Sequence, residues 1–302
     1  MPVINSSSFA KALWPGVNAW YGKAYNEFAS EWDKIYSQHK SRKAFEEDVG
    51  VSGFGLAAVK SEGNGISYDS ERQGFTTRYN HVVYALGFVI TREAFEDDQY
   101  DIVGEKKAKA LAMSMRQTKE TVGANVINRA FTSGYTGGDG VVLCSSAHPN
   151  VAGGTWSNII STAADISEAA LEQAYIDMSA WTNDRGLKIA VKPKALLIAP
   201  ANIFDAARIL DADGRSGTAD NDPNVLKNKG IIPQTIVNHY LTDSDAWFIL
   251  TDVSDGLKYW ERRGDEFDMD NEFDNENAKF KATARYAFGW TDPRIIYGSA
   301  GA

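Results

Sequence analysis

The sequence GDEFDMDNEFDNENAKFKATARYAFGW, residues 264–290, contains two segments in which apolar and charged residues alternate. In residues 266–273 the apolar side chains occupy odd positions and carboxylates occupy even ones. In residues 279–290 the apolar side chains occupy even positions, and the basic residues lie between them. A period of two is typical of a strand with one buried face. The stretch therefore predicts a β-hairpin with its turn at Asp274–Asn277.

That turn predicts one register for the two strands. It places Glu272 opposite Lys279, Asp270 opposite Lys281, and Glu266 opposite Arg285, while Phe267 and Met269 face Ala284 and Ala282. The same register aligns the apolar face and the opposite charges. Each exposed ion pair contributes only a few tenths of a kcal/mol, roughly, so the apolar face must dominate. We interpret the carboxylates as residues that specify register.

A calcium loop is the alternative explanation for so many carboxylates. Counting from Asp268, oxygen ligands recur at alternate positions. Such a loop needs glycine at its sixth position and glutamate at its twelfth, where this chain has Phe273 and Lys279. The stretch therefore predicts no metal ligands.

Charge and composition exclude several classes of protein. The chain has 302 residues and a net charge of −9, whereas a protein that grips a phosphate backbone normally presents a basic face. The densest basic stretch, residues 39–43, suits the solvated end of a helix. Direct nucleic-acid recognition is therefore not expected.

The chain carries no feature that directs it across or into a membrane. The only cysteine, Cys144, cannot form an internal disulfide, which fits a reducing compartment. The first residues lack the pattern of a signal peptide, and no apolar run approaches the ~20 residues that span a bilayer. We expect a soluble protein that stays where it is made.

Aromatic residues recur at helical spacing near the N-terminus, which predicts an amphipathic helix from Val17 to His39. Its apolar face either packs in the core or is buried against a neighbouring subunit. Residues 50–75 are rich in glycine and predict a long two-stranded excursion, with Phe54–Lys60 and Ile66–Ser70 on either side of a turn. This excursion is either a mobile loop or an arm that packs on another chain.

The remaining pattern mixes strands and helices without regular alternation. We predict a strand over 75–91, a long helix over 102–131 and a helix over 167–182 that is capped by Asp165. Further strands are expected at 195–199, 231–237 and 246–250, with a helix at 202–210 and an exposed loop at 211–223. This order favours an α+β fold over a doubly wound sheet.

Candidate catalytic residues lack partners. The chain contains neither a phosphate-binding loop nor a nucleophile elbow. Cys144 and His148 could form half of a metal site or a thiol–imidazole pair, but no second pair of ligands follows. The acidic group at 93–98 suits the start of a long helix better than acid–base catalysis. We therefore predict no enzyme, and no catalytic, cofactor-binding or metal-binding residues.

Three segments resemble the major capsid proteins of tailed phages, specifically the Mu-like major head subunit group. These are ITREAFEDDQYDIVGEKKAKALAMS (90–114), NVINRAFTSGYTGGDGVVLCSSAHPNVAGGTWSN (125–158) and RYAFGWTDPRIIYGSAGA (285–302). The resemblance covers nearly the whole chain and depends on the order of the elements. It implies the Hong Kong 97 phage capsid fold and a structural subunit that forms hexamers and pentamers of an icosahedral head around double-stranded DNA.

The resemblance also implies a division of the chain. Residues 1–49 would be an N-terminal arm, 50–75 an extended loop on a neighbouring subunit, and 76–199 a peripheral domain with a spine helix at about 102–133. Residues 200–250 would be an axial domain, and 251–302 would return to the peripheral sheet. Expected partners are copies of the chain, a scaffold, a portal, a decoration protein and non-specifically packaged DNA, in a virion assembled in the host cytoplasm.

Two departures from the family limit what the resemblance implies. The chain shows no long N-terminal scaffolding domain. Lys60 lies in the extended loop, where one phage of this fold forms a cross-link, but no motif identifies a partner asparagine, so we predict no cross-link. The rival hypotheses are an encapsulin-like nanocompartment shell and a metal-dependent enzyme.

Overall fold

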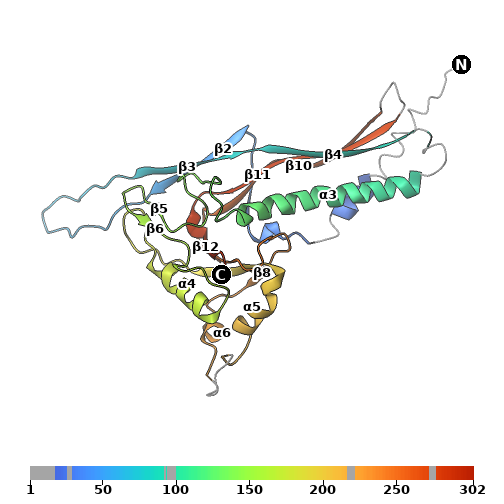
Figure 1. The fold of residues 1–302 in the computed structure, drawn as a ribbon. Coiled ribbons are helices and arrows are strands. Elements are labelled where there is room, and N and C mark those ends of the chain that lie inside the picture. Colours follow the sequence, from blue (N-terminus) through green and yellow to red (C-terminus); the bar gives the residue numbers. More distant parts are fainter. Residues whose placement is uncertain (1–17, 26–28, 92, 94–99, 216–221, 272–276) are drawn as a thin grey trace.

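The computed structural model describes residues 18–25, 29–91, 93, 100–215, 222–271 and 277–302. Figure 1 shows a long sheet with one long helix beneath it, a thin hairpin that reaches away at one end, and a tapering lower part. Helices and strands are mixed, which confirms the predicted α+β class. Among the described helices, none is long and apolar enough to cross a membrane.

The opening stretch forms the predicted hairpin. Strands β10 (Leu257–Asn271) and β11 (Ala278–Trp290) pair antiparallel. The predicted register was wrong by two residues: Asp270 lies opposite Lys279, and Lys281 lies opposite Asp268, whose carboxylate is 3.5 Å away. The residues at the turn, 272–276, lie outside the described part of the chain, and so does the expected partner Glu272.

A shift of two residues keeps every side chain on its predicted face, because the side-chain period of a strand is two. Phe267 therefore still faces the core, opposite Ala282. Glu266 does not meet Arg285; it lies opposite Thr283 and forms an ion pair with Arg263 on its own strand, at 3.4 Å. Irregularities in β10 between Glu261 and Glu266 change the offset between the strands, and the alternation of residue types cannot reveal them.

The hairpin belongs to a four-stranded sheet in the order β1-β10-β11-β4, where β1 is Ser37–Lys40 and β4 is Val82–Ile90. Helix α3 (Tyr100–Asn128) packs on one face and confirms the predicted long helix. Lys119 of α3 is buried among the rings of Trp32, Tyr259 and Tyr286, and its ammonium lies 3.3 Å from the Asp265 carboxylate.

The predicted N-terminal helix over 17–39 was wrong in its second half. Residues 18–25 are helical, but Trp32–Lys34 form the 3-10 turn η1, and Ser37–Lys40 form β1. The carboxylate of Glu120 accepts the backbone N–H groups of Glu31 and Trp32, so α3 holds the segment in this turn. The aromatic side chains pack in the core of the same chain: Tyr21 stacks on Phe267 with ring centroids 4.7 Å apart.

Strands β2 (Phe45–Ser52) and β3 (Arg72–Asn80) form the thin hairpin, and β3 leads almost directly into β4. The predicted excursion is present, but Phe54–Lys60 and Ile66–Ser70 are not strands; residues 53–71 leave the ladder and form an extended loop. A register irregularity lies between Val49 and Val51, where Gly50 and Gly74 approach closely. A Cβ on Gly74 would lie 2.8 Å from the Gly50 carbonyl oxygen, so this contact needs glycine.

The lower part contains a second sheet in the order β12-β9-β7-β8. Its strands are β7 (Pro193–Ile198), β8 (Thr235–Val237), β9 (Trp247–Thr251) and β12 (Ile296–Ser299). One face packs against the core beneath α3, and the other is covered by α4 (Glu168–Ala180), α5 (Ile203–Leu210) and α6 (Val225–Lys229). The N-cap of α4 is Ser167 and not the predicted Asp165, whose carboxylate instead accepts the Ala302 N–H.

This sheet joins segments that the expected division separates. Strand β7 precedes residue 200 yet pairs with β8 and β9, and β12 comes from the C-terminal tail. Short elements complete the fold: β5 (His148–Pro149), β6 (Thr155–Trp156) and the 3-10 turns η2 (Pro200–Asn202) and η3 (Pro293–Ile295). In the predicted loop at 211–223, residues 216–221 lie outside the described part of the chain.

Candidate functional site

The candidate reactive residues Cys144 and His148 lie in separate environments. Cys144 is buried in the main apolar core, and burial raises the pKa of its thiol. His148 is also buried, but its ring contacts polar side chains. Within the described ranges, no group of three histidine, cysteine or carboxylate side chains could hold a metal ion. In the acidic group, Glu93 is exposed, and residues 94–98 lie outside the described part.

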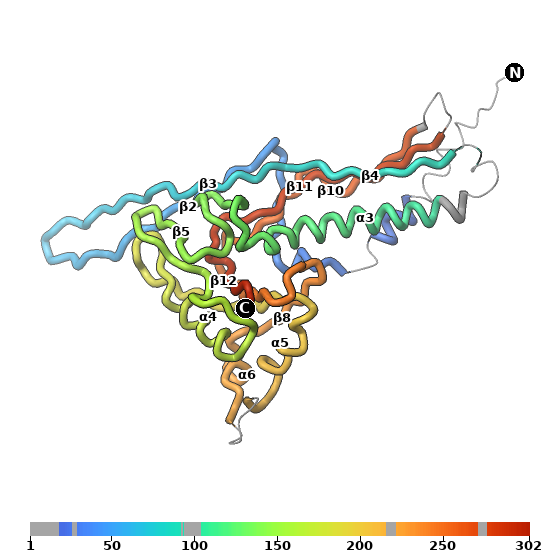
Figure 2. Tube along the Cα trace, viewed as in Figure 1, coloured from blue at the N-terminus to red at the C-terminus, as the bar shows by residue number. Residues whose placement is uncertain are grey.

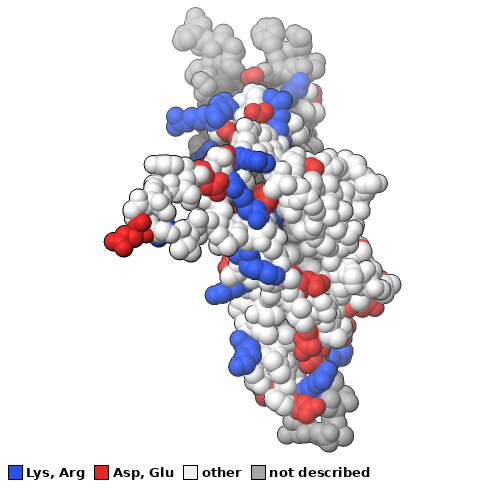
Figure 3. Space-filling view, turned by 90° about the vertical axis from the view of Figure 1, so that its left-hand side faces the viewer, with Lys and Arg blue, Asp and Glu red and all other residues white. Residues whose placement is uncertain are grey.

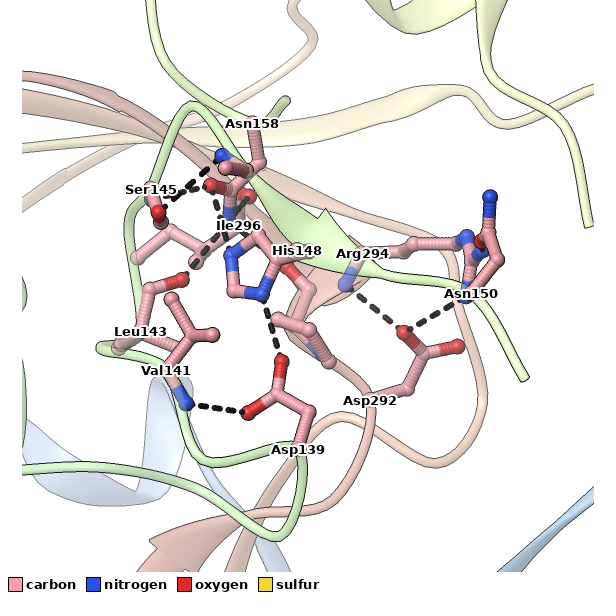
Figure 4. A network of polar contacts seen from close by, with 12 residues as sticks. Asp139, Val141, Leu143, Ser145, His148, Asn150, Asn158, Asp292, Arg294 and Ile296 are labelled. Atoms are coloured by element: carbon pink, nitrogen blue, oxygen red, sulfur yellow. Dashed lines mark hydrogen bonds and ion pairs between the residues drawn. The ribbon is translucent and has the colours of Figure 1, made fainter. Parts of the chain in front are cut away.

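His148 lies between two oxygen acceptors, as Figure 4 shows. Its Nδ1 is 2.7 Å from the Asp139 carboxylate, and its Nε2 is 3.1 Å from the side-chain oxygen of Asn158. The orientation of the Asn158 amide is fixed, because its oxygen also accepts the Ser145 N–H at 2.8 Å. Asp139 and Asn158 therefore hold the imidazole ring of His148 in one orientation.

The nitrogen of the Asn158 side chain ties this loop to the C-terminal segment. It donates to the carbonyl oxygens of Leu143, Pro293 and Ile296 at 2.8, 3.2 and 3.1 Å. Residue 158 is itself fully buried. One amide therefore joins Leu143 to the C-terminal segment 293–296, two stretches that are far apart in the sequence.

Arg294 extends the network toward the hairpin (Figure 4). Its guanidinium lies 4.4 Å from the ring of Trp156, which stacks on His148, and it donates to the Thr182 carbonyl oxygen at 3.1 Å. Burial raises the pKa of the neighbouring Asp292 carboxyl, although the charge of Arg294 opposes the shift. These residues border a cavity of about 390 Å³ whose opposite wall is the base of the hairpin, residues 48–53 and 74–75.

A buried ion pair fixes the base of the hairpin to the long sheet. Lys258 of β10 donates to Asp48 of β2 and, at 2.9 Å, to Asp255. Burial disfavours the charged carboxylate of Asp48, but hydrogen bonds from Lys258 and Thr291 outweigh it and lower the pKa of Asp48. The hairpin therefore leaves the body in a fixed direction.

A second contact reaches the loop itself. Asp69 accepts the backbone N–H groups of Gly55 and Ser70, both at 2.8 Å, and pairs with Arg185 at 3.0 Å. These hydrogen bonds, led by that from Gly55, lower the pKa of Asp69. Arg185 lies in a turn between α4 and β7 and also donates to the Ser70 carbonyl oxygen. We call this contact the Arg185–Asp69 clamp.

The loop beyond the clamp exposes apolar side chains. The exposed fractions are 83% for Leu56, 98% for Val59 and 89% for Tyr68. Isolated exposed apolar residues are common, but a 19-residue segment of this kind with no ladder bonds marks an interaction site. Viewed from the hairpin end, Figure 3 shows charges of both signs interspersed on the body and not one basic surface.

Sequence reasoning identified the loop but missed its attachments. The Arg185–Asp69 clamp, the Lys258–Asp48 pair and the Asn158 amide each join residues far apart in the chain. No local motif accompanies any of them. His148 was singled out in the sequence, but its partners Asp139 and Asn158 were not.

The body thus carries an extended hairpin whose loop exposes apolar side chains that the described part of the chain does not cover. The chain belongs to the phage capsid protein family, whose sequence model matches residues 74–298. This match confirms the family-level resemblance and makes the chain a structural major capsid protein of the virion. No curated protein sequence matches the chain significantly.

Solved structures confirm the Hong Kong 97 phage capsid fold. The mature capsid of bacteriophage PhiM1 aligns with a TM-score of 0.56 and 11% identity, covering 90% of this chain and 87% of that one. The virus-like particle of Pyrococcus furiosus gives 0.55 and 14%, covering 94% and 98%. The procapsid of bacteriophage JBD30 gives 0.51 and 14%, covering 97% and 75%.

Proposed function

We propose that copies of this chain form hexamers and pentamers of an icosahedral phage head that encloses double-stranded DNA. The observation that carries the proposal is the exposed apolar loop at residues 53–71, which the chain itself leaves uncovered. A lone hairpin gains little from its own contacts in water, so a neighbouring copy is its natural support. The family match favours this role over a nanocompartment shell.

The proposal assigns a role to each part of the chain. Residues 25 and 31–32 of the N-terminal arm are hydrogen-bonded to α3, the hairpin lies on a neighbouring subunit, and the long sheet with α3 forms the peripheral domain. The part with α5, α6 and β9 forms the axial domain, which meets its copies around the capsomer axis. Strand β7 extends the sheet of that domain, so we place its boundary before Pro193 and not at residue 200.

Further partners follow from the same role. We propose that a scaffold and a portal take part in assembly in the host cytoplasm, and that a decoration protein binds the finished shell. The net charge of −9 suits a shell that packages DNA without specific contacts. The subunit acts without catalysis, metal or cofactor, and Lys60 forms no cross-link.

Electron microscopy of the expressed chain, together with its neighbouring genes, tests the proposal. We expect closed, thin-walled shells or free capsomers. A variant that combines Leu56→Ser, Val59→Ser and Tyr68→Ser should fold normally but give few closed shells, because the hairpin loses its apolar contacts. Ser67→Ala, in the same loop, is the control and should assemble like the wild type. A wild-type chain that remains monomeric under all these conditions would overturn the proposal.

A further inference from the structure

Helix α4 presents an apolar and acidic surface on one flank of the tapering lower part (Figure 1). Its inner side is buried in the second core, while Ile176 is 59% exposed and Tyr175 is also exposed. Glu172 lies one helical turn before Ile176 and therefore shares its side of the helix. Among the described residues, Glu172 forms no ion pair.

Helices α5 and α6 present an apolar and basic surface on the other flank. Phe204 is 72% exposed at the start of α5, with Arg208 one turn further on. Val225 is exposed at the start of α6, with Lys229 one turn further on. Arg208 pairs with Asp205, whereas Lys229 forms no ion pair within the described ranges.

The two surfaces lie at opposite sides of one packed layer of helices. Residues of α4, α5 and α6 pack into the same core on the same face of the second sheet. Tyr297 of β12, at one edge of that sheet, donates to Asp177 of α4, whereas α5 follows β7 and lies toward β8 at the other edge. Each surface thus faces away from the other.

Neighbouring charged residues in the described part of the chain do not neutralise Glu172 on the α4 surface or Lys229 on the α5–α6 surface. Arg215 is paired with Glu168 at the N-terminal end of α4, at 2.9 Å, and Lys188 donates to the Ala180 carbonyl oxygen at the other end. Glu172 and Lys229 are therefore the charges beside the exposed apolar residues that remain available to a partner.

We propose that the α4 surface of one copy packs against the α5–α6 surface of the next copy. Among the described residues, the unpaired charge beside the apolar residues is negative on the α4 surface (Glu172) and positive on the α5–α6 surface (Lys229), so the two surfaces attract each other. A contact between two different surfaces of the same chain is heterologous, and it closes into a ring when the rotation between copies permits. The inference rests on the proposed function and names the surfaces through which copies meet around the capsomer axis.

Paired cysteines test the contact directly. Ile176→Cys and Phe204→Cys are introduced in separate chains, which are co-assembled and treated with a short bismaleimide. We expect a covalent dimer from the mixture and none from either variant alone. Cys144 is buried and should stay unmodified. Val59→Cys mixed with Phe204→Cys, which joins the hairpin to α5, is the control and should give no dimer.

A charge reversal gives an independent test. Glu172→Lys or Lys229→Glu should raise the concentration needed for assembly about threefold, and the double variant should recover most of the loss. Lys106→Glu, an exposed change of the same charge on α3, should have a smaller effect.

Shells that form normally but give no 176–204 dimer, or a double variant no better than the single ones, would overturn this inference and leave the proposed function intact. A dimer from Ile176→Cys alone would overturn it in favour of a symmetric contact. Failure of the unmodified chain to assemble would instead overturn the proposed function.

Discussion

At the scale of single residues, the buried side chain of Asn158 makes several hydrogen bonds at once. Replacing it with alanine removes its hydrogen bonds to three carbonyl groups, to the Ser145 N–H and to a nitrogen of His148. We predict that Asn158→Ala lowers the free energy of unfolding by about 3 kcal/mol, measured by urea denaturation of the free subunit. Asn228→Ala, at an exposed position, should change it by less than about 0.5 kcal/mol. Equal effects of the two would show that the network contributes nothing.

Asp48 gives a prediction about pH. Its pKa is lowered in the folded state, so its contribution is complete above the unfolded value near 3.8 and is lost as the pH falls through the folded value. At pH 7 we predict that Asp48→Asn costs about 2 kcal/mol of unfolding free energy, because buried Lys258 then keeps only Asp255, whose carboxylate is exposed, as a charged partner. The difference from the wild type should shrink steadily below pH 4, and a constant difference down to pH 2 would contradict the assignment.

At the scale of elements, the Arg185–Asp69 clamp controls the order of the hairpin loop and not the stability of the body. Asp69 is exposed and Arg185 is partly exposed, so the loss of this pair should leave the unfolding transition nearly unchanged. We predict that Arg185→Ala speeds amide hydrogen exchange in residues 53–71 severalfold, while exchange in β2 and β3 stays as in the wild type. Lys194→Ala, at an exposed position on β7, is the control. Unchanged exchange in the loop would show that the clamp does not order it.

At the scale of the whole molecule, the hairpin loop extends from the packed body and is uncovered. Lys60 is exposed near the tip of the arm, so trypsin should cleave there in the free subunit. We predict that assembly slows this cleavage by at least about tenfold, because a neighbouring copy then covers the loop. The measurement is limited proteolysis of capsomers and shells at equal subunit concentration. Equal rates in both forms would contradict burial of the loop.

The amino-acid sequence by itself determined which faces of the elements are buried. The alternation in residues 264–290 placed Phe267 and Ala282 on the inner face, and the apolar spacing in α3 marked the long helix. Such periodic patterns are local, so they can be recognised without knowing which distant residues pack against them. The order of the predicted helices and strands along the chain can also be read from the sequence, and this order indicated the phage capsid family.

Tertiary structure decided everything that joins distant residues. Glu120 holds residues 31–32 in a turn where aromatic spacing alone predicted a helix, and bulges in β10 moved Asp270 from Lys281 to Lys279. The Asn158 amide and the Arg185–Asp69 clamp have no local signature, because their partners come together only when the chain folds. Periodicity specifies a face, whereas register, clamps and assembly surfaces depend on geometry between elements, which only the packed molecule provides.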